Sequence, residues 1–151
     1  MIHEHALPNP SATKAAAGNL AELCRPGDVI CLFGDLGVGK TTFARGFLRA
    51  LGVVDEIPSP TFNLLLTYNT AVGTVWHFDL YRLNAPDEIL ELGFEDAMVD
   101  GISLIEWPDQ LGHWLPVPRI EIHLAETRSD TSRQLRLRAV GPGSERWRAP
   151  W

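Results

Sequence analysis

The residues of this chain that are best placed to do chemistry are the eight at positions 34–41, which read GDLGVGKT. They match the phosphate-binding loop pattern G-x-x-x-x-G-K-[ST] at every fixed position. Glycines let several backbone N–H groups point into one small concavity, and a following helix N-terminus adds partial positive charge. Lys40 would reach the β- and γ-phosphates of a nucleotide, and the Thr41 hydroxyl would be the inner protein ligand of Mg²⁺. The pattern therefore predicts a nucleotide site with Mg²⁺.

The sequence on both sides of this loop has the strand and helix that the motif requires. Residues 29–33 are an apolar run, and residues 42–51 carry apolar side chains at helical spacing. A glycine-rich turn that caps a helix by chance is the alternative, and both flanks argue against it. We expect the nucleotide phosphates to be contacted by Leu36, Gly37, Val38, Gly39, Lys40, Thr41 and Thr42, with Thr42 serving the α-phosphate.

Two other stretches end in an acid that could complete the site. Residues 75–79 alternate between polar and apolar and end at Asp79, whereas residues 102–106 are almost continuously apolar and end at Glu106. A continuous apolar run is typical of a central parallel strand buried on both faces, so Glu106 is the expected metal-site acid. Asp79 would then orient the attacking water or sense the γ-phosphate. An ordinary strand-end carboxylate remains the alternative for each.

Other polar and aromatic residues are weaker candidates. Two prolines hold residues 57–61 extended, which leaves Ser59 and Thr61 free to face a ligand. Arg82 would pair with Asp79 or neutralise a phosphoryl group, with a surface arginine as the alternative, and Trp107 would wall the site or pack in the core. His77 is expected on the surface of its strand, and the spacing of the histidines does not suggest zinc.

The elements that must position these residues predict an α/β domain of three layers, similar to P-loop NTPases, in which helices flank a mixed central sheet. Ser11 is expected to cap a helix over residues 12–24. Antiparallel hairpins are expected at 62–68 with 72–80 and at 119–124 with 133–139, and a short helix from residue 84. The chain is predicted to be one domain, 1–151, with residues 1–9 and 142–151 as candidate flexible arms.

Composition limits the class of ligand and partner. The net charge is −6 and Lys14 and Lys40 are the only lysines, so a polybasic nucleic-acid surface is not expected. Seven of the eleven arginines lie between residues 119 and 148, where an exposed strand face is the main interpretation and a docking surface the alternative. Cys24 and Cys31 are expected to be unpaired thiols. No apolar run approaches a membrane span, so we expect a cytoplasmic protein without a membrane partner.

The base of the nucleotide can be inferred from what the sequence lacks. Guanine-specific loop proteins use an Asn-Lys-x-Asp stretch, and neither lysine lies in one. ATP is therefore the expected nucleotide. Contacts to adenine are expected either near Pro10 and Ser11 or from the C-terminal hairpin.

Four stretches, in this order and spacing, resemble the bacterial TsaE family, also called YjeE. They read GDLGVGKTTF at 34–43, SPTF at 59–62, HFDLYR at 77–82 and IEWP at 105–108. The resemblance extends from about residue 10 to about residue 125. Val38 stands where alanine is common in the family, and the stretch after Arg128 matches nothing that can be aligned.

The resemblance implies a small ATPase needed for threonylcarbamoylation of adenosine 37 in tRNA. Family members bind the TsaB–TsaD complex, and their ATP hydrolysis is thought to reset it between turnovers. By resemblance, Lys40 and Thr41 bind phosphate and Mg²⁺, Glu106 also serves the metal, and Asp79 and Trp107 matter for hydrolysis. Residues 59–61 would belong to a switch-like loop near the γ-phosphate.

The expected activity is Mg²⁺-dependent ATP hydrolysis, slow without partner proteins, with any contact to tRNA indirect or weak. Two other functions fit a phosphate-binding loop. One is a small-molecule kinase, although only Arg45, Arg49 and Arg82 lie between the loop and Glu106 to serve a lid. The other is a nucleotide-gated binding module in which hydrolysis is incidental.

Overall fold

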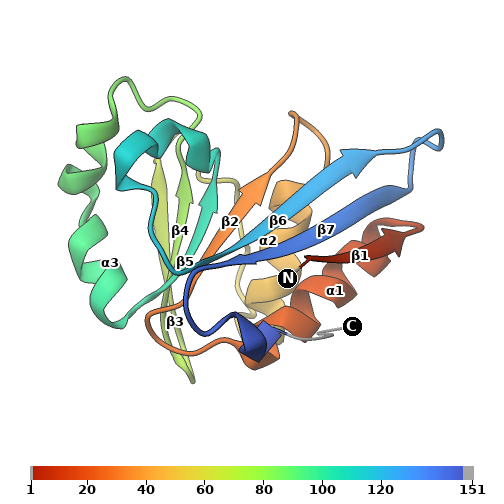
Figure 1. The fold of residues 1–151 in the computed structure, drawn as a ribbon, viewed down its shortest axis with the longest axis horizontal. Coiled ribbons are helices and arrows are strands. Elements are labelled where there is room, and N and C mark those ends of the chain that lie inside the picture. The colour runs from red at the N-terminus through yellow and green to blue at the C-terminus, as the bar shows by residue number, and fades with distance from the viewer. Residues whose placement is uncertain (1, 148–151) are drawn as a thin grey trace.

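The computed structural model describes residues 2–147, and within them seven strands form one mixed sheet in the order β1-β7-β6-β2-β5-β4-β3 (Figure 1). The strands are β1 (Ile2–Leu7), β2 (Val29–Phe33), β3 (Leu65–Thr70), β4 (Gly73–Asp79), β5 (Ile102–Glu106), β6 (Arg119–Glu126) and β7 (Arg133–Val140). The α-helices are α1 (Pro10–Leu23), α2 (Lys40–Ala50) and α3 (Phe94–Asp100). Three 3₁₀ helices are found in the described residues, η1 (Pro86–Leu92), η2 (Pro108–Trp114) and η3 (Ser144–Trp147).

The centre of the sheet is parallel and its margins are antiparallel. Strand β2 pairs in parallel with β5 on one side and β6 on the other, and β5 pairs in parallel with β4. The hairpins β3–β4 and β6–β7 are antiparallel, and β1 adds an antiparallel edge beside β7. The expected position of residues 102–106 beside the strand that precedes the phosphate-binding loop is therefore confirmed.

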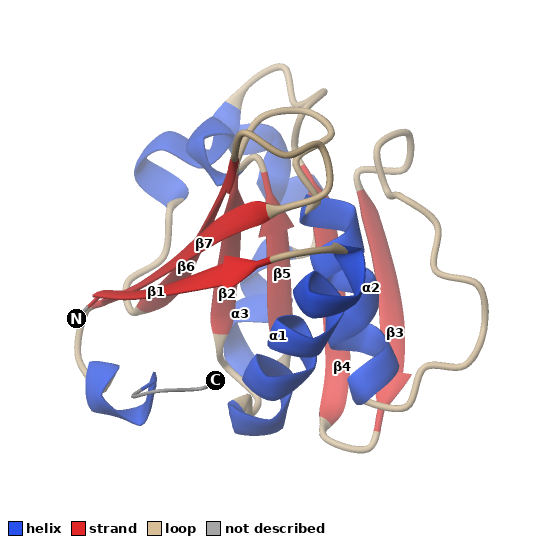
Figure 2. Cartoon of the chain, turned by 90° about the vertical axis from the view of Figure 1, so that its right-hand side faces the viewer, coloured by secondary structure: helices blue, strands red, loops and turns tan. Residues whose placement is uncertain are grey.

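Helices cover the two faces of the sheet unequally (Figure 2). Helices α1 and α2 pack on one face, against Ile30 and Leu32 of β2 and the inward side chains of β6 and β7. On the other face η1, α3 and η2 cover Cys31, Phe78 and Ile105 of the central strands. The predicted fold class, a three-layer α/β domain with a mixed sheet, is confirmed.

The N-terminal segment differs from the candidate flexible arm over residues 1–9, of which residue 1 lies outside the described residues. Residues 2–7 form β1, which is held by its pairing with β7 and by the fully buried side chain of Leu7. Helix α1 begins at Pro10 rather than after Ser11, because the side chain of Asn9 caps it and accepts a hydrogen bond from Ala12 N at 2.9 Å.

The second candidate arm, residues 142–151, is ordered as far as the structure describes it. Residues 144–147 form η3, and Trp147 is buried. The guanidinium of Arg146 donates to both carboxylate oxygens of Asp28, at 2.8 and 2.9 Å. The rest of this predicted arm, residues 148–151, lies outside the described residues.

Two local predictions need adjustment. Strand β3 starts at Leu65, three residues later than expected, because Leu64 adopts a φ of 65° in a turn closed by Leu64 N and Pro60 O. The short helix after Asn84 is a 3₁₀ helix, and α3 beyond it was not predicted.

Cys24 and Cys31 are free thiols, as expected, and burial raises the pKa of Cys31 to about 12. None of the helices in residues 2–147 has the length and apolar character needed to cross a bilayer.

The contact between α1 and α2 yields a first prediction. A Cβ atom at Gly46 would lie 2.5 Å from the Cα of Lys14, whereas one at Gly18 would meet only Ala50 Cβ at 3.4 Å. Gly46→Ala should therefore push the helices apart and lower the free energy of unfolding by about 1–3 kcal/mol. Gly18→Ala is the matched control and should be neutral or stabilising by up to about 1 kcal/mol. Urea denaturation measures both, and equal effects would contradict this account of the packing.

The outer face of β6 yields a second prediction, on pH. Burial acts to raise the pKa of Glu121, but hydrogen bonds from His123 and Arg119 outweigh it and hold the pKa below the ordinary 4.5. The folded protein thus binds fewer protons here than the unfolded chain. The stabilisation is complete above the unfolded pKa and is lost as the pH falls through the lower folded value.

The advantage of the wild type over Glu121→Gln in urea denaturation should therefore be constant from about pH 7 to about pH 5 and shrink below about pH 4.5. A difference that does not change between about pH 5 and about pH 3 would count against the paired state of this carboxylate.

Candidate functional site

A cleft of about 300 Å³ opens at the carboxyl edge of the parallel strands β2, β4 and β5. Parallel strands end at one edge, so residues far apart in the sequence meet there. The lining consists of Leu36, Gly37, Gly39, Lys40, Thr41, Thr42, Ser59, Thr61, Asp79, Glu106 and Trp107. Most of the residues proposed from the sequence are therefore brought into one cleft.

The loop between β2 and α2 depends on glycine at its first and last turns. Gly34 has a φ of 148°, and a Cβ there would lie 2.7 Å from the carbonyl oxygen of Leu124. Gly39 has a φ of 117° and precedes α2, where its carbonyl accepts a hydrogen bond from Phe43 N at 2.9 Å. The loop thus presents the N-terminal N–H groups of α2 toward the cleft, as a site for an anion requires.

Lys40 lies at the centre of the cleft and is only 5% exposed. Its Nζ donates to the carbonyl oxygen of Gly34 and lies 3.4 Å from the ring centroid of Trp107. Burial lowers the pKa of Lys40, while the carboxylates of Glu106 and Asp79 oppose that change. Trp107 has a φ of 59°, and its ring also contacts Tyr81, with centroids 5.0 Å apart. The ammonium group is therefore held by one carbonyl and one aromatic face.

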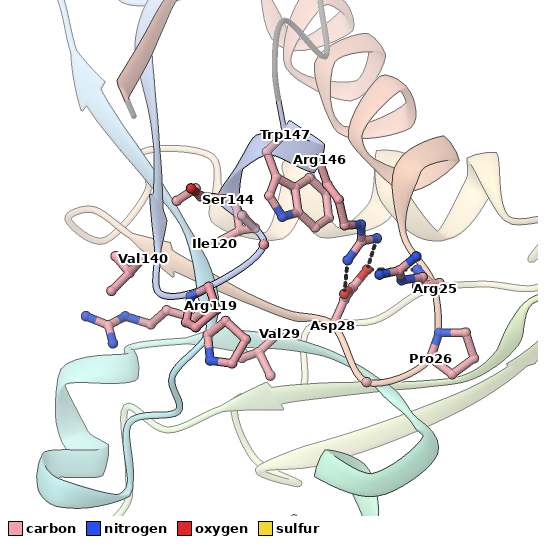
Figure 3. A pocket seen from close by; sticks show the side chains of 15 residues that line it. Arg25, Pro26, Asp28, Val29, Arg119, Ile120, Val140, Ser144, Arg146 and Trp147 are labelled. Atoms are coloured by element: carbon pink, nitrogen blue, oxygen red, sulfur yellow. Dashed lines mark hydrogen bonds and ion pairs between the residues drawn. The ribbon is translucent and has the colours of Figure 1, made fainter.

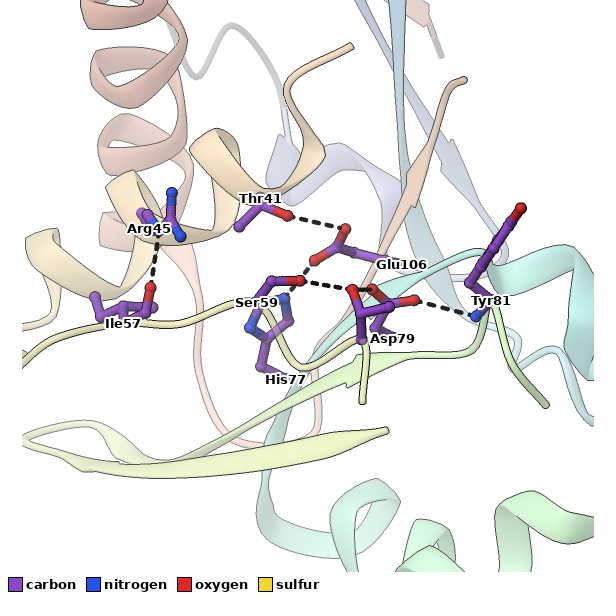
Figure 4. Close-up of polar contacts among 9 residues, drawn as sticks. Thr41, Arg45, Ile57, Ser59, His77, Asp79, Tyr81 and Glu106 are labelled. Carbon is purple, nitrogen blue, oxygen red and sulfur yellow. Dashed lines mark hydrogen bonds and ion pairs between the residues drawn. The ribbon is translucent and has the colours of Figure 1, made fainter. Parts of the chain in front are cut away.

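Thr41 and Glu106 are the residues that could hold a metal ion. The Thr41 hydroxyl donates to Glu106 Oε1 at 3.4 Å, although the two residues are 65 positions apart (Figure 4). Adjacent oxygen ligands of an octahedral Mg²⁺ are about 3 Å apart, so this pair has fitting chemistry and spacing. Across residues 2–147 no group of three or more His, Cys, Asp or Glu side chains could hold a metal. A cation here would take its other ligands from phosphate oxygens and water.

Asp79 faces the same cleft from the end of β4 and is opposite Glu106 in the β4–β5 pair. Its side chain is buried and accepts hydrogen bonds from Thr61 Oγ1 at 2.8 Å and Tyr81 N at 3.1 Å. Ser59 and Thr61 share a hydrogen bond of 2.7 Å. The loop that carries these hydroxyls is thus tied directly to the carboxylate.

The prediction that His77 lies on an exposed strand surface is wrong. His77 is fully buried, and its Nε2 is 2.7 Å from Glu106 Oε2. The alternation in β4 does not separate a solvent face from a core face, because α2 covers one side and α3 with η1 covers the other. The signal that could have located His77 is its spacing from Asp79. The two residues are two positions apart in one strand, so both side chains lie on the side of the sheet where the cleft forms.

Arg82 does not pair with Asp79. Its guanidinium lies over the ring of Phe62, 4.4 Å from the ring centroid, and Arg82 does not line the cleft. Asp79 takes its hydrogen bonds from Thr61 and the Tyr81 backbone instead.

A second pocket of about 200 Å³ shares Gly37, Gly39 and Thr42 with the cleft. Pro10 and Thr13 of α1 line it from one side, and the β6–β7 turn lines it from the other with Asp130, Thr131 and Arg133. Ser11 is not in the lining, although Pro10 is. Arg133 Nε also donates to Val38 O at 2.9 Å, so the turn is attached to the phosphate-binding loop. Both segments that were alternatives for base contacts therefore border one pocket.

A third pocket, of about 270 Å³, lies at the opposite end of the sheet, where β2 starts at Val29 (Figure 3). Two of its arginines donate hydrogen bonds to carboxylates of the protein. Arg146 donates to Asp28, and Arg119 donates to Glu121 at 2.8 Å. The phosphate-binding loop follows the other end of β2, so this pocket is separate from the cleft.

Known proteins with similar sequences support one family. The family model described as "Threonylcarbamoyl adenosine biosynthesis protein TsaE" matches residues 7–135. The chain is 48% identical over 119 residues to the tRNA threonylcarbamoyladenosine biosynthesis protein TsaE of Rickettsia felis, covering 78% of this chain and 70% of the relative. It is 40% identical over 134 residues to the protein of that name from Bacillus subtilis, covering 88% and 83%.

A solved structure has the same fold. The crystal structure of Bacillus subtilis YdiB matches with a TM-score of 0.80 and 34% sequence identity, covering 96% of this chain and 90% of that chain. The resemblance drawn from the four sequence stretches is thereby confirmed, and the chain belongs to the TsaE family.

Proposed function

We propose that this protein is a Mg²⁺-dependent ATPase of tRNA threonylcarbamoyladenosine synthesis that supports or resets a TsaB–TsaD complex. Membership of the TsaE family supports the tRNA-modification role. The observation that carries the proposed activity is the convergence of Lys40, Thr41, Glu106 and Asp79 on one cleft beside the phosphate-binding loop. Each of these groups has a distinct task in phosphoryl transfer to water.

Phosphate binding falls to the loop and Lys40. The first N–H groups of α2 have no partners within the helix and suit an anion. Lys40, held by a carbonyl and an aromatic ring, would exchange these contacts for the stronger charge-assisted hydrogen bonds of a phosphate. A bound Mg²⁺ would neutralise negative charge on the phosphate oxygens, with Thr41 and Glu106 as its residues.

Asp79 is the proposed group that orients water. Its Oδ2 bond to Thr61 and Oδ1 bond to the Tyr81 backbone fix the plane of the carboxylate. Carboxylate oxygens can each accept further hydrogen bonds, so Asp79 could still accept from a water molecule. Because Thr61 belongs to the loop after α2, a movement of that loop would change the orientation of Asp79.

The second pocket is the proposed site of the adenine base. It adjoins the loop through Gly37, Gly39 and Thr42 and is bounded by Pro10 and Thr13 of α1 and the β6–β7 turn. Thr13 is buried, and Asp130 and Thr131 add polar groups at the rim. Polar groups of this kind can form hydrogen bonds with the polar edge of an adenine ring.

The charge in the cleft supports the proposal that hydrolysis is slow without a partner. Among residues 2–147 the lining contains one cation, Lys40, and Arg82 is over Phe62 instead. An arginine supplied in trans can accelerate phosphoryl transfer by about 10³-fold or more. We therefore propose that TsaB–TsaD stimulates hydrolysis. With a net charge of −6, any contact of this chain with tRNA is proposed to be indirect or weak.

The central test compares the two lysines of the chain. Lys40→Ala should weaken Mg²⁺–ADP binding by about 10- to 100-fold, the value of a charge-assisted hydrogen bond. Lys14→Ala removes the other lysine, which is exposed on α1, and should bind as the wild type does. Calorimetry gives the affinities, and phosphate release with and without TsaB and TsaD gives the activity. Unchanged binding by Lys40→Ala, or hydrolysis indifferent to both partners, would contradict the proposal.

Asp79→Asn separates catalysis from binding. The amide oxygen can still accept from Thr61, but the amide has no second acceptor for Tyr81 N and can no longer act as a base, so hydrolysis should fall about 10²- to 10⁴-fold while ADP affinity stays nearly unchanged. tRNA modification in a reconstituted system should fall with it. Full modification by a variant that has lost hydrolysis would indicate a nucleotide-gated binding module instead.

A further inference from the structure

The buried imidazole of His77 has no task in the function proposed so far. Its ring is inaccessible to solvent on the side of β4 that faces α2, directly behind the carboxylate of Glu106. We propose that His77 is a positioning residue that fixes the orientation of the Glu106 carboxylate for the metal ion. This inference rests on the proposed Mg²⁺–nucleotide site and adds a residue to it.

The two oxygens of Glu106 are held from opposite sides. His77 Nε2 donates to Oε2 at 2.7 Å, and the Thr41 hydroxyl donates to Oε1 at 3.4 Å (Figure 4). The shorter bond comes from the ring of His77. The β4 backbone and its packing hold this ring in place, since His77 is paired with Leu104 of β5. With Oε2 tethered, rotation of the carboxylate is restricted and Oε1 stays directed toward Thr41.

The burial of His77 indicates that its hydrogen bond to Glu106 is the reason for a histidine at this position. The neighbours on the same face, Val75 and Leu104, are apolar and fully buried. The other ring nitrogen of His77, Nδ1, is buried and has no hydrogen-bond partner among residues 2–147. A half-satisfied polar ring in such a place is less favourable than an apolar side chain. The ring therefore costs stability, and its polar contact within the described part of the chain is with Glu106.

His77 is not itself placed to bind the metal. Nε2 is engaged with the far oxygen of Glu106, and His77 is not among the residues that line the cleft. Groups that act behind a metal ligand in this way typically change metal affinity by about 10- to 100-fold when they are removed.

The test uses two amides that place an N–H group at different distances from the backbone. His77→Gln can present its amide nitrogen near the position of Nε2, within reach of Glu106. His77→Asn reaches only the position of Nδ1 and is the matched control of equal polarity. The measurement is the ratio of ADP affinities with Mg²⁺ and with EDTA, obtained by calorimetry, together with the urea midpoint of each variant.

We expect His77→Asn to lose about 10-fold or more of the Mg²⁺-linked gain in ADP affinity, while its affinity in EDTA matches the wild type. His77→Gln should keep most of that gain. Equal losses in both variants, or a fall in EDTA affinity that parallels the urea midpoint, would assign His77 a merely structural role and overturn the inference. A wild-type linkage in both variants would overturn it as well. If the wild-type protein shows no Mg²⁺ linkage, the proposed function fails, which is a separate result.

Discussion

The structure depends on keeping three charged groups, Lys40, Asp79 and Glu106, almost out of water at one edge of a sheet. None of them is more than 5% exposed. A buried charge without partners is strongly unfavourable, so each must be met by fixed polar groups. Lys40 has a carbonyl and an aromatic face, Asp79 has a hydroxyl and a backbone N–H, and Glu106 has His77 and Thr41. The same low polarity that makes the cluster costly strengthens its interaction with a charged ligand.

Packing outside the cleft makes this arrangement possible. The close approach of α1 and α2 at Gly46 sets the position of α2, and Thr41 in its first turn must reach Glu106 on β5. The β6–β7 turn reaches the same loop through Arg133 and the carbonyl of Val38. Elements from both ends of the chain thus hold the short segment that binds phosphate in the proposed function.

The sequence predicted best the features that depend on neighbouring residues. The strand, loop and helix around residues 29–51 follow from local composition, and the continuous apolar run before Glu106 correctly identified the central strand. Alternation failed for β4, because period two indicates that the two faces of a strand differ in polarity but not that either face meets solvent, and helices cover both faces of β4. His77 was misplaced for that reason. The hydrogen bond from Arg133 to the loop spans 95 residues, and the N-terminal edge strand depends on β7, so neither left a local signal.

Trp107 shows how the two helical layers meet in the site. The loop and Lys40 belong to the layer of α1 and α2, whereas Trp107 is the N-cap residue before η2 and packs with the core of the opposite layer. Its left-handed backbone, unusual for a bulky residue, brings the indole around the end of β5 to face Lys40. In the proposed function, a phosphate that draws Lys40 away would compete with this contact. In that function, the net affinity for a nucleotide would be the difference between two arrangements of one ammonium group, and the second helical layer contributes Trp107 to the arrangement without phosphate.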